Sequence, residues 1–84
     1  MSKLEKQKQR LLEKPKDYKW SELKSLLISM GYRESNSGKT SGSRVRFIHK
    51  IHGQINLHKP HPKPVLKSYQ VKQIVDQLKK EGLL

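Results

Sequence analysis

The chain of 84 residues carries 19 lysines and arginines against seven aspartates and glutamates, a formal net charge of +12. A domain this basic suits a polyanion; the alternatives are an acidic protein partner or a basic surface that serves only solubility. The chain has no cysteine, which excludes a disulfide scaffold, thiolate metal sites and a cysteine nucleophile. Its length allows one small domain and no second independent core.

No apolar run approaches the ~20 residues that a membrane-spanning helix requires. The first residues are charged throughout and therefore lack the apolar centre of a secretory signal. We expect a cytoplasmic protein without membrane association.

Residues 1–17 form a basic arm. Residues 2–14 are rich in helix formers, and Ser2 can act as the N-cap. The apolar residues of the arm are Leu4, Leu11 and Leu12, whose spacings of seven and eight make a thin stripe. The arm is therefore either a short helix that packs on the domain or a frayed extension. Pro15 ends it, and Asp17 can cap the helix that follows.

Residues 18–84 form the domain, which begins and ends with an amphipathic helix. In residues 20–30, apolar side chains recur at three- and four-residue spacing, and Gly31 suits a left-handed C-terminal residue. Ser68 opens the second helix, residues 69–82, whose apolar face comprises Val71, Ile74, Val75 and Leu78.

Three strands are expected between these helices. The first begins at Tyr32 and leads into the polar loop of residues 34–42. The other two form a hairpin, in which Gly53 supplies the positive φ that the turn needs. Residues 58–64 contain three prolines and cannot pair as a ladder strand, so they should form a stiff connector.

This order predicts an α+β fold of two layers, in which both helices pack on one face of a three-stranded antiparallel sheet. Alternation places Val45 and Phe47 toward the helices and turns Arg44 and Arg46 to the other face. The predicted core comprises Trp20, Leu23, Leu27, Met30, Val45, Phe47, Ile55, Leu57, Val71, Ile74, Val75 and Leu78. The remaining aromatic residues, Tyr18, Tyr32 and Tyr69, are left as possible stacking partners for bases.

All four histidines lie within residues 41–64, at His49, His52, His58 and His61. His58 and His61 straddle Pro60 in an extended segment with no carboxylate near in sequence, so we expect neither a metal site nor a cofactor. The run SGKTSGS, residues 37–43, lacks the spacing of a phosphate-binding loop and is typical of a linker.

Acid–base chemistry on RNA is the remaining candidate reaction. RNA cleavage needs a group that activates the 2′-hydroxyl, another that protonates the leaving oxygen, and a cation near the phosphate. His58 and His61 can transfer protons, and the cations that the expected fold places beside them are Arg44, Arg46, Lys59 and Lys63. Binding through phosphates and 2′-hydroxyls without cleavage is the alternative.

A family resemblance rests on the run WSELKSLLISMGY, then GSRVRF, then a further strand, and then HKPHPKP before the last helix. In these motifs and their order, residues 19–84 resemble the HicA toxins of bacterial HicA–HicB toxin–antitoxin pairs. The resemblance implies a double-stranded-RNA-binding-like α-β-β-β-α fold, ribosome-independent mRNA interferase activity and neutralisation by a HicB antitoxin.

The resemblance also assigns site residues. Gly42 and Ser43 match the Gly-Ser-His start of the family's catalytic strand, but Arg44 stands where that catalytic histidine should be. The family's later Pro-x-His element corresponds to residues 59–61. We therefore expect catalysis by His58 or His61, and RNA binding by Ser43, Arg44, Arg46, Lys59 and Lys63. Three hypotheses remain open: a toxin that still cleaves RNA, an RNA binder that has lost catalysis, and an interaction module that docks an acidic antitoxin.

Overall fold

The computed structural model describes residues 2–35, 44–60 and 62–84. Its elements are α1 (Lys3–Leu12), α2 (Trp20–Ser29), β1 (Arg33–Ser35), β2 (Arg44–His49), β3 (Gly53–His58) and α3 (Ser68–Lys80). This is the predicted α-β-β-β-α order of the double-stranded-RNA-binding-like fold, with the additional N-terminal helix in front. None of the described helices combines the length and the apolar character needed to cross a membrane.

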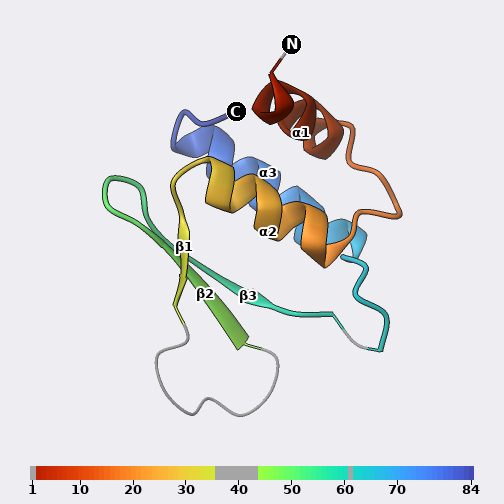
Figure 1. Ribbon diagram of the computed structural model, residues 1–84. Coiled ribbons are helices and arrows are strands. Elements are labelled where there is room, and N and C mark those ends of the chain that lie inside the picture. The colour runs from red at the N-terminus through yellow and green to blue at the C-terminus, as the bar shows by residue number, and fades with distance from the viewer. Residues whose placement is uncertain (1, 36–43, 61) are drawn as a thin grey trace.

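The sheet has the order β1-β2-β3, and both of its pairings are antiparallel. Helices α2 and α3 lie together on one side of it (Figure 1). Phe47, Ile55 and Leu57 point toward these helices and are buried, whereas Arg44 and Arg46 are exposed on the opposite face. The predicted inward and outward faces of the hairpin are therefore confirmed.

The core is larger than predicted at the segments that precede and follow α2. Tyr18 and Tyr32 are only 1% and 2% exposed, so the prediction that they are available for base stacking is wrong. Burial raises the pKa of both phenols, because the charged phenolate is disfavoured away from water. Two predicted core residues, Met30 and Val45, are only partly buried at the margin of the cluster.

The connector after β3 pairs with the segment that precedes α2. The Trp20 N–H donates to the Pro64 carbonyl at 2.9 Å, and the Leu66 N–H donates to the Tyr18 carbonyl at 2.8 Å. These two bonds flank a β-bridge between Lys19 and Val65. Residues 62–64 form bends, so the expectation of an extended connector is wrong for them. The pairing at Pro64 and Leu66 fixes the starts of α2 and α3 side by side.

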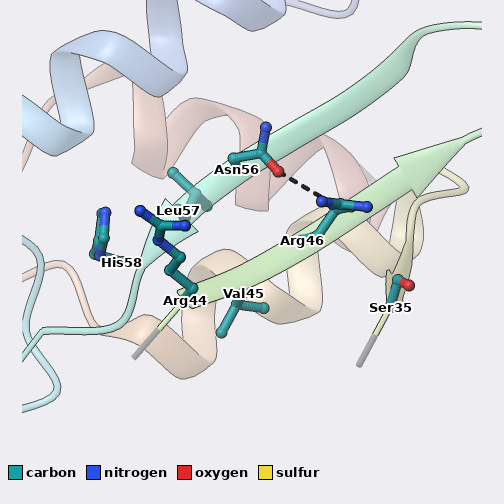
Figure 2. A pocket seen from close by; sticks show the side chains of 7 residues that line it. All are labelled: Ser35, Arg44, Val45, Arg46, Asn56, Leu57 and His58. Atoms are coloured by element: carbon teal, nitrogen blue, oxygen red, sulfur yellow. Dashed lines mark hydrogen bonds between the residues drawn. The ribbon is translucent and has the colours of Figure 1, made fainter. Parts of the chain in front are cut away.

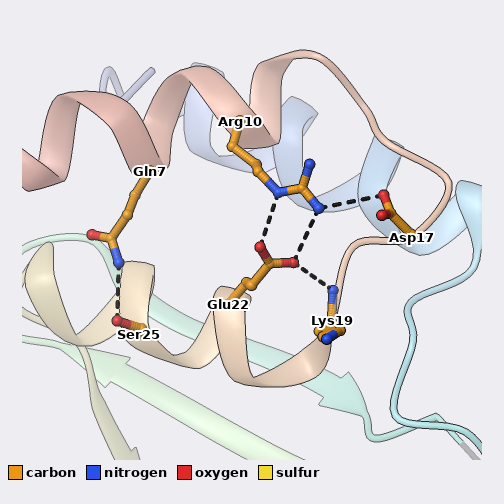
Figure 3. A network of polar contacts seen from close by, with 6 residues as sticks. All are labelled: Gln7, Arg10, Asp17, Lys19, Glu22 and Ser25. Atoms are coloured by element: carbon orange, nitrogen blue, oxygen red, sulfur yellow. Dashed lines mark hydrogen bonds and ion pairs between the residues drawn. The ribbon is translucent and has the colours of Figure 1, made fainter.

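Helix α1 packs on the domain, which decides between the two alternatives for the N-terminal arm. Its Leu11 is fully buried in the common core. Figure 3 shows the polar contacts between α1 and α2. Arg10 Nε donates to Glu22 Oε1 at 2.9 Å, and Gln7 Nε2 donates to Ser25 Oγ at 2.9 Å. The same guanidinium pairs with Asp17 at 3.3 Å. Asp17 therefore does not cap α2 as expected; the N-cap is Lys19, whose N–H donates to Glu22.

Two glutamines of α3 bind the backbone of the edge strand β3. Gln70 Nε2 donates to the His58 carbonyl at 3.1 Å, and Gln77 Nε2 donates to the Gln54 carbonyl at 3.3 Å. The Gln70 side chain is buried, and its Oε1 also accepts the Lys67 N–H at the start of α3. Both ends of β3 are thereby attached to α3.

Candidate nucleic-acid interface

The face of the sheet that points away from the helices is basic. Strand alternation and the pairing register place eight side chains on this outer face: Arg33, Ser35, Arg44, Arg46, Ile48, Gln54, Asn56 and His58. All seven carboxylates of the protein lie elsewhere, at Glu5, Glu13, Asp17, Glu22, Glu34, Asp76 and Glu81. Glu34 is the one acidic residue in the sheet, and it pairs with Lys24 of α2 at 3.0 Å. The outer face therefore offers cations and neutral polar groups to a ligand, with no carboxylate to repel an anion.

A hollow of about 380 Å³ opens where β2 begins and β3 ends (Figure 2). Its lining residues are Ser35, Arg44, Val45, Arg46, Asn56, Leu57 and His58. Both arginines that were predicted to bind RNA, Arg44 and Arg46, and one of the two histidines predicted to be catalytic, His58, therefore line one hollow.

Arg46 is oriented across the sheet by its partner in the register. It lies opposite Asn56, and Arg46 Nε donates to Asn56 Oδ1 at 3.3 Å. This contact uses the Nε–H only, so the two terminal amino groups remain available to a ligand in the hollow. A guanidinium presented in this way can bind a phosphate with two parallel hydrogen bonds.

Arg44 and His58 form the next outward-facing pair along the strands, directly opposite each other. In Figure 2 the Arg44 side chain extends toward the His58 ring. His58 is exposed, and the bond from Gln70 to its carbonyl fixes the end of the strand that carries it. The hollow therefore combines an exposed imidazole, able to exchange protons, with two guanidinium groups.

The other histidines of the described chain have structural contacts. His49 Nδ1 accepts the N–H groups of Ile51 and His52 at 3.0 and 3.2 Å, which places the ring proton on Nε2, 3.2 Å from the Met30 carbonyl. His52 Nδ1 lies 3.2 Å from Glu81 Oε1. Both residues belong to the hairpin turn, at the end of β2 and β3 away from the hollow.

The remaining predicted site residues lie outside the hollow or outside the described residues. Lys59 and Lys63 are exposed on the connector beyond β3 and do not line the hollow. Ser43 and His61 fall outside the described residues. Within residues 2–35, 44–60 and 62–84, no three acidic or histidine side chains gather in a way that could hold a metal ion.

Sequence reasoning missed the two other polar residues of the hollow, Asn56 and Ser35. Asn56 shares its strand face with His58, so alternation alone would have included it. Ser35 ends a strand of three residues, too short for alternation to indicate a face, and only its pairing with Arg46 brings it to the site.

A family model described as the HicA toxin of bacterial toxin–antitoxin matches residues 20–83. The match runs from the first residue of α2 to beyond the end of α3, and it leaves α1 outside. Neither a search of curated proteins nor a search of solved structures gives a match. Because the family model matches well over half of the chain, the protein belongs to the HicA family of bacterial toxin–antitoxin toxins.

Proposed function

We propose that this toxin binds RNA on the outer face of its sheet, cleaves it at the hollow, and is neutralised by a HicB-like antitoxin that covers the same face. The observation that carries the proposal is the grouping of Arg44, Arg46 and His58 on a face without carboxylates. Backbone phosphates are the RNA groups best matched to such a face, because they are anionic and accept paired hydrogen bonds.

His58 is the proposed proton-transfer group. Cleavage by the 2′-hydroxyl forms a bond from the 2′-oxygen to phosphorus and breaks the bond to the 5′-oxygen. One proton leaves the 2′-oxygen, and another is delivered to the 5′-oxygen. The imidazole of His58 can perform one of these transfers, and His61 is the candidate for the other. Arg44 and Arg46 would stabilise the additional negative charge that develops on the phosphate.

RNA binding without cleavage is the second candidate function. It is favoured by the replacement at Arg44, where the resemblance to HicA toxins places the catalytic histidine. It is also favoured by the single imidazole among the described residues of the hollow. Under this hypothesis the toxin would act by occupying RNA.

The test is incubation of the purified protein with a mixed-sequence RNA, with His58→Ala and His61→Ala in parallel. Loss of cleavage in either variant, with RNA still bound, supports the nuclease. Bound but intact RNA with the unaltered protein supports the second function. Lys80→Ala, which truncates an exposed side chain at the far end of α3, is the control for a substitution away from the hollow. Failure of the unaltered protein to bind RNA would contradict both functions.

Neutralisation is tested by competition. A HicB-like antitoxin that neutralises the toxin should displace labelled RNA from the protein, because both ligands are proposed to use the same face. An antitoxin that binds the toxin while leaving the RNA in place would show that the two surfaces are separate.

A further inference from the structure

Tyr69 is the one residue among the tyrosines, the tryptophan and the phenylalanine whose side chain is exposed to solvent. Tyr18, Trp20, Tyr32 and Phe47 are all buried, whereas Tyr69 is 59% exposed. Its ring packs on no other aromatic ring, and its hydroxyl has no hydrogen-bond partner among the described residues. A large ring at the surface with no structural contact of this kind is available to a ligand.

Tyr69 lies at the same end of the molecule as the hollow. The next residue, Gln70, donates its hydrogen bond to the His58 carbonyl, so the first turn of α3 is attached to the end of β3. Figure 1 shows the start of α3 close to that end of the sheet. An RNA strand that leaves the hollow past His58 and continues around the edge of β3 would meet the first turn of α3.

The surroundings of Tyr69 favour an anionic ligand. Lys67 and Lys72 are exposed on either side of it in the sequence, and neither takes part in an ion pair among the described residues. Asp76 is the acidic residue on the same exposed side of α3, two turns further along the helix. The first turn thus pairs an exposed aromatic ring with cations, the combination that holds single-stranded nucleic acid by stacking a base and neutralising its phosphates.

We propose that Tyr69 stacks on a base of a single-stranded RNA segment whose phosphates are bound by Arg44 and Arg46. The proposal rests on the proposed RNA binding and adds the class of substrate. In a duplex the faces of the bases are covered by their neighbours, so a stacking tyrosine can act only on an unpaired strand. Among the described residues, the outer face of the sheet carries the imidazole of His58 but no tyrosine, tryptophan or phenylalanine. Tyr69 therefore adds the larger stacking surface, which an unpaired base can reach and a paired base cannot.

The experiment compares three labelled probes by fluorescence anisotropy: a single-stranded oligoribonucleotide, the same oligonucleotide with abasic sites, and a blunt duplex of that sequence. The variants are Tyr69→Ala, Tyr69→Phe and Tyr69→Leu. Ile51→Ala is the matched control, because Ile51 is 81% exposed at the opposite end of the hairpin. Thermal unfolding of each variant checks that the fold is kept.

We expect Tyr69→Ala to weaken binding of the single strand by about tenfold, with Tyr69→Phe retaining affinity and Tyr69→Leu losing it. The abasic strand and the duplex should bind all variants alike, and Ile51→Ala should bind as the unaltered protein does. Equal losses on the abasic strand, or full affinity in Tyr69→Ala, would overturn the role of Tyr69 while leaving RNA binding intact. An absence of binding to every probe by the unaltered protein would overturn the proposed function, and this inference with it.

Discussion

The imidazole of His49 lies against Gly31, at the point where α2 turns into the sheet. A Cβ atom added to Gly31 would come within 2.9 Å of His49 Nε2, the nitrogen that faces the Met30 carbonyl. The backbone of Gly31 has a φ of 103°, a conformation that other residues rarely adopt. The end of α2 and the hairpin turn are therefore fitted to each other through a residue without a side chain.

Gly31→Ala should destabilise the protein more than Gly53→Ala. Both substitutions force a side chain into a positive φ, which costs about 1–2 kcal/mol, but a Cβ at Gly53 has nothing within 4 Å. Only the first variant must also displace His49. The free energies of unfolding, obtained from denaturant titrations, measure the difference between the two. Equal losses of unfolding free energy in the two variants would show that His49 moves away from the new Cβ without destabilising the protein.

The pairing of Glu22 with Arg10 should make the protein sensitive to acid. The hydrogen bond from Arg10, supported by the Lys19 N–H, holds the pKa of Glu22 below its usual 4.5, although burial opposes this shift. A carboxyl whose pKa is lower in the folded state stabilises that state above the unfolded pKa. The stabilisation is lost as pH falls through the lower, folded value.

Glu22→Gln provides the test of this pH dependence. The amide keeps an oxygen for the Lys19 N–H but removes the charge, so the variant should be less stable than the unaltered protein at neutral pH. The difference should shrink as pH falls below about 4.5. Denaturant midpoints measured across this range give the comparison, and a difference that stays constant with pH would contradict the assignment.

Arg44→Ala should weaken RNA binding and flatten its dependence on salt. A phosphate contact to a single strand contributes about 0.7 to the slope of log affinity against log salt concentration, so the variant should lose about that amount. Binding titrations at several salt concentrations measure the slope. Lys80→Ala removes the same charge at the far end of α3 and should leave the slope unchanged; an equal effect in both variants would indicate a diffuse effect of net charge.

Asn56→Ala should reduce RNA affinity through Arg46, although it removes no charge. The lost hydrogen bond frees the Arg46 guanidinium, and a net contribution of about 1 kcal/mol corresponds to roughly fivefold weaker binding. With Arg46→Ala already present, the Asn56 substitution should have little further effect. Gln54→Ala, on the same strand face but paired with Ile48, is the control. Additive losses in the double variant would mean that Asn56 contacts RNA by itself.

The sequence was sufficient to predict α2, α3, β2 and β3, because each of these elements carries its own periodic signal. The apolar spacing of α2 and α3 and the alternation in β2 depend only on nearby residues, and they correctly placed Phe47 inward and Arg44 outward. The same alternation predicts that Arg46 and His58 lie together on the outer face. The residues that β2 and β3 contribute to the outer face of the hollow were therefore predictable from the sequence.

What could not be predicted depends on pairing between distant segments. The Tyr18 side chain is buried in the core, and its backbone carbonyl accepts from Leu66, 48 residues further along the chain; no local pattern indicates this pairing. The docking of α1 likewise depends on Leu11 and on the contact between Arg10 and Glu22. Such contacts between distant segments decide which of the tyrosines outside the predicted core are exposed to a ligand. Tyr18 and Tyr32 are buried, and Tyr69 is exposed.

The two glutamines of α3 have a consequence for the behaviour of the toxin at high concentration. An edge strand with free carbonyls can pair with a strand of another molecule and begin aggregation. In β3, the carbonyls of His58 and Gln54 already accept hydrogen bonds from Gln70 and Gln77. A strand of another molecule would have to displace these two side chains before it could bind the same carbonyls. The protein can thus leave a whole sheet face open to a ligand while two carbonyls of its β3 edge are already bonded to its own side chains.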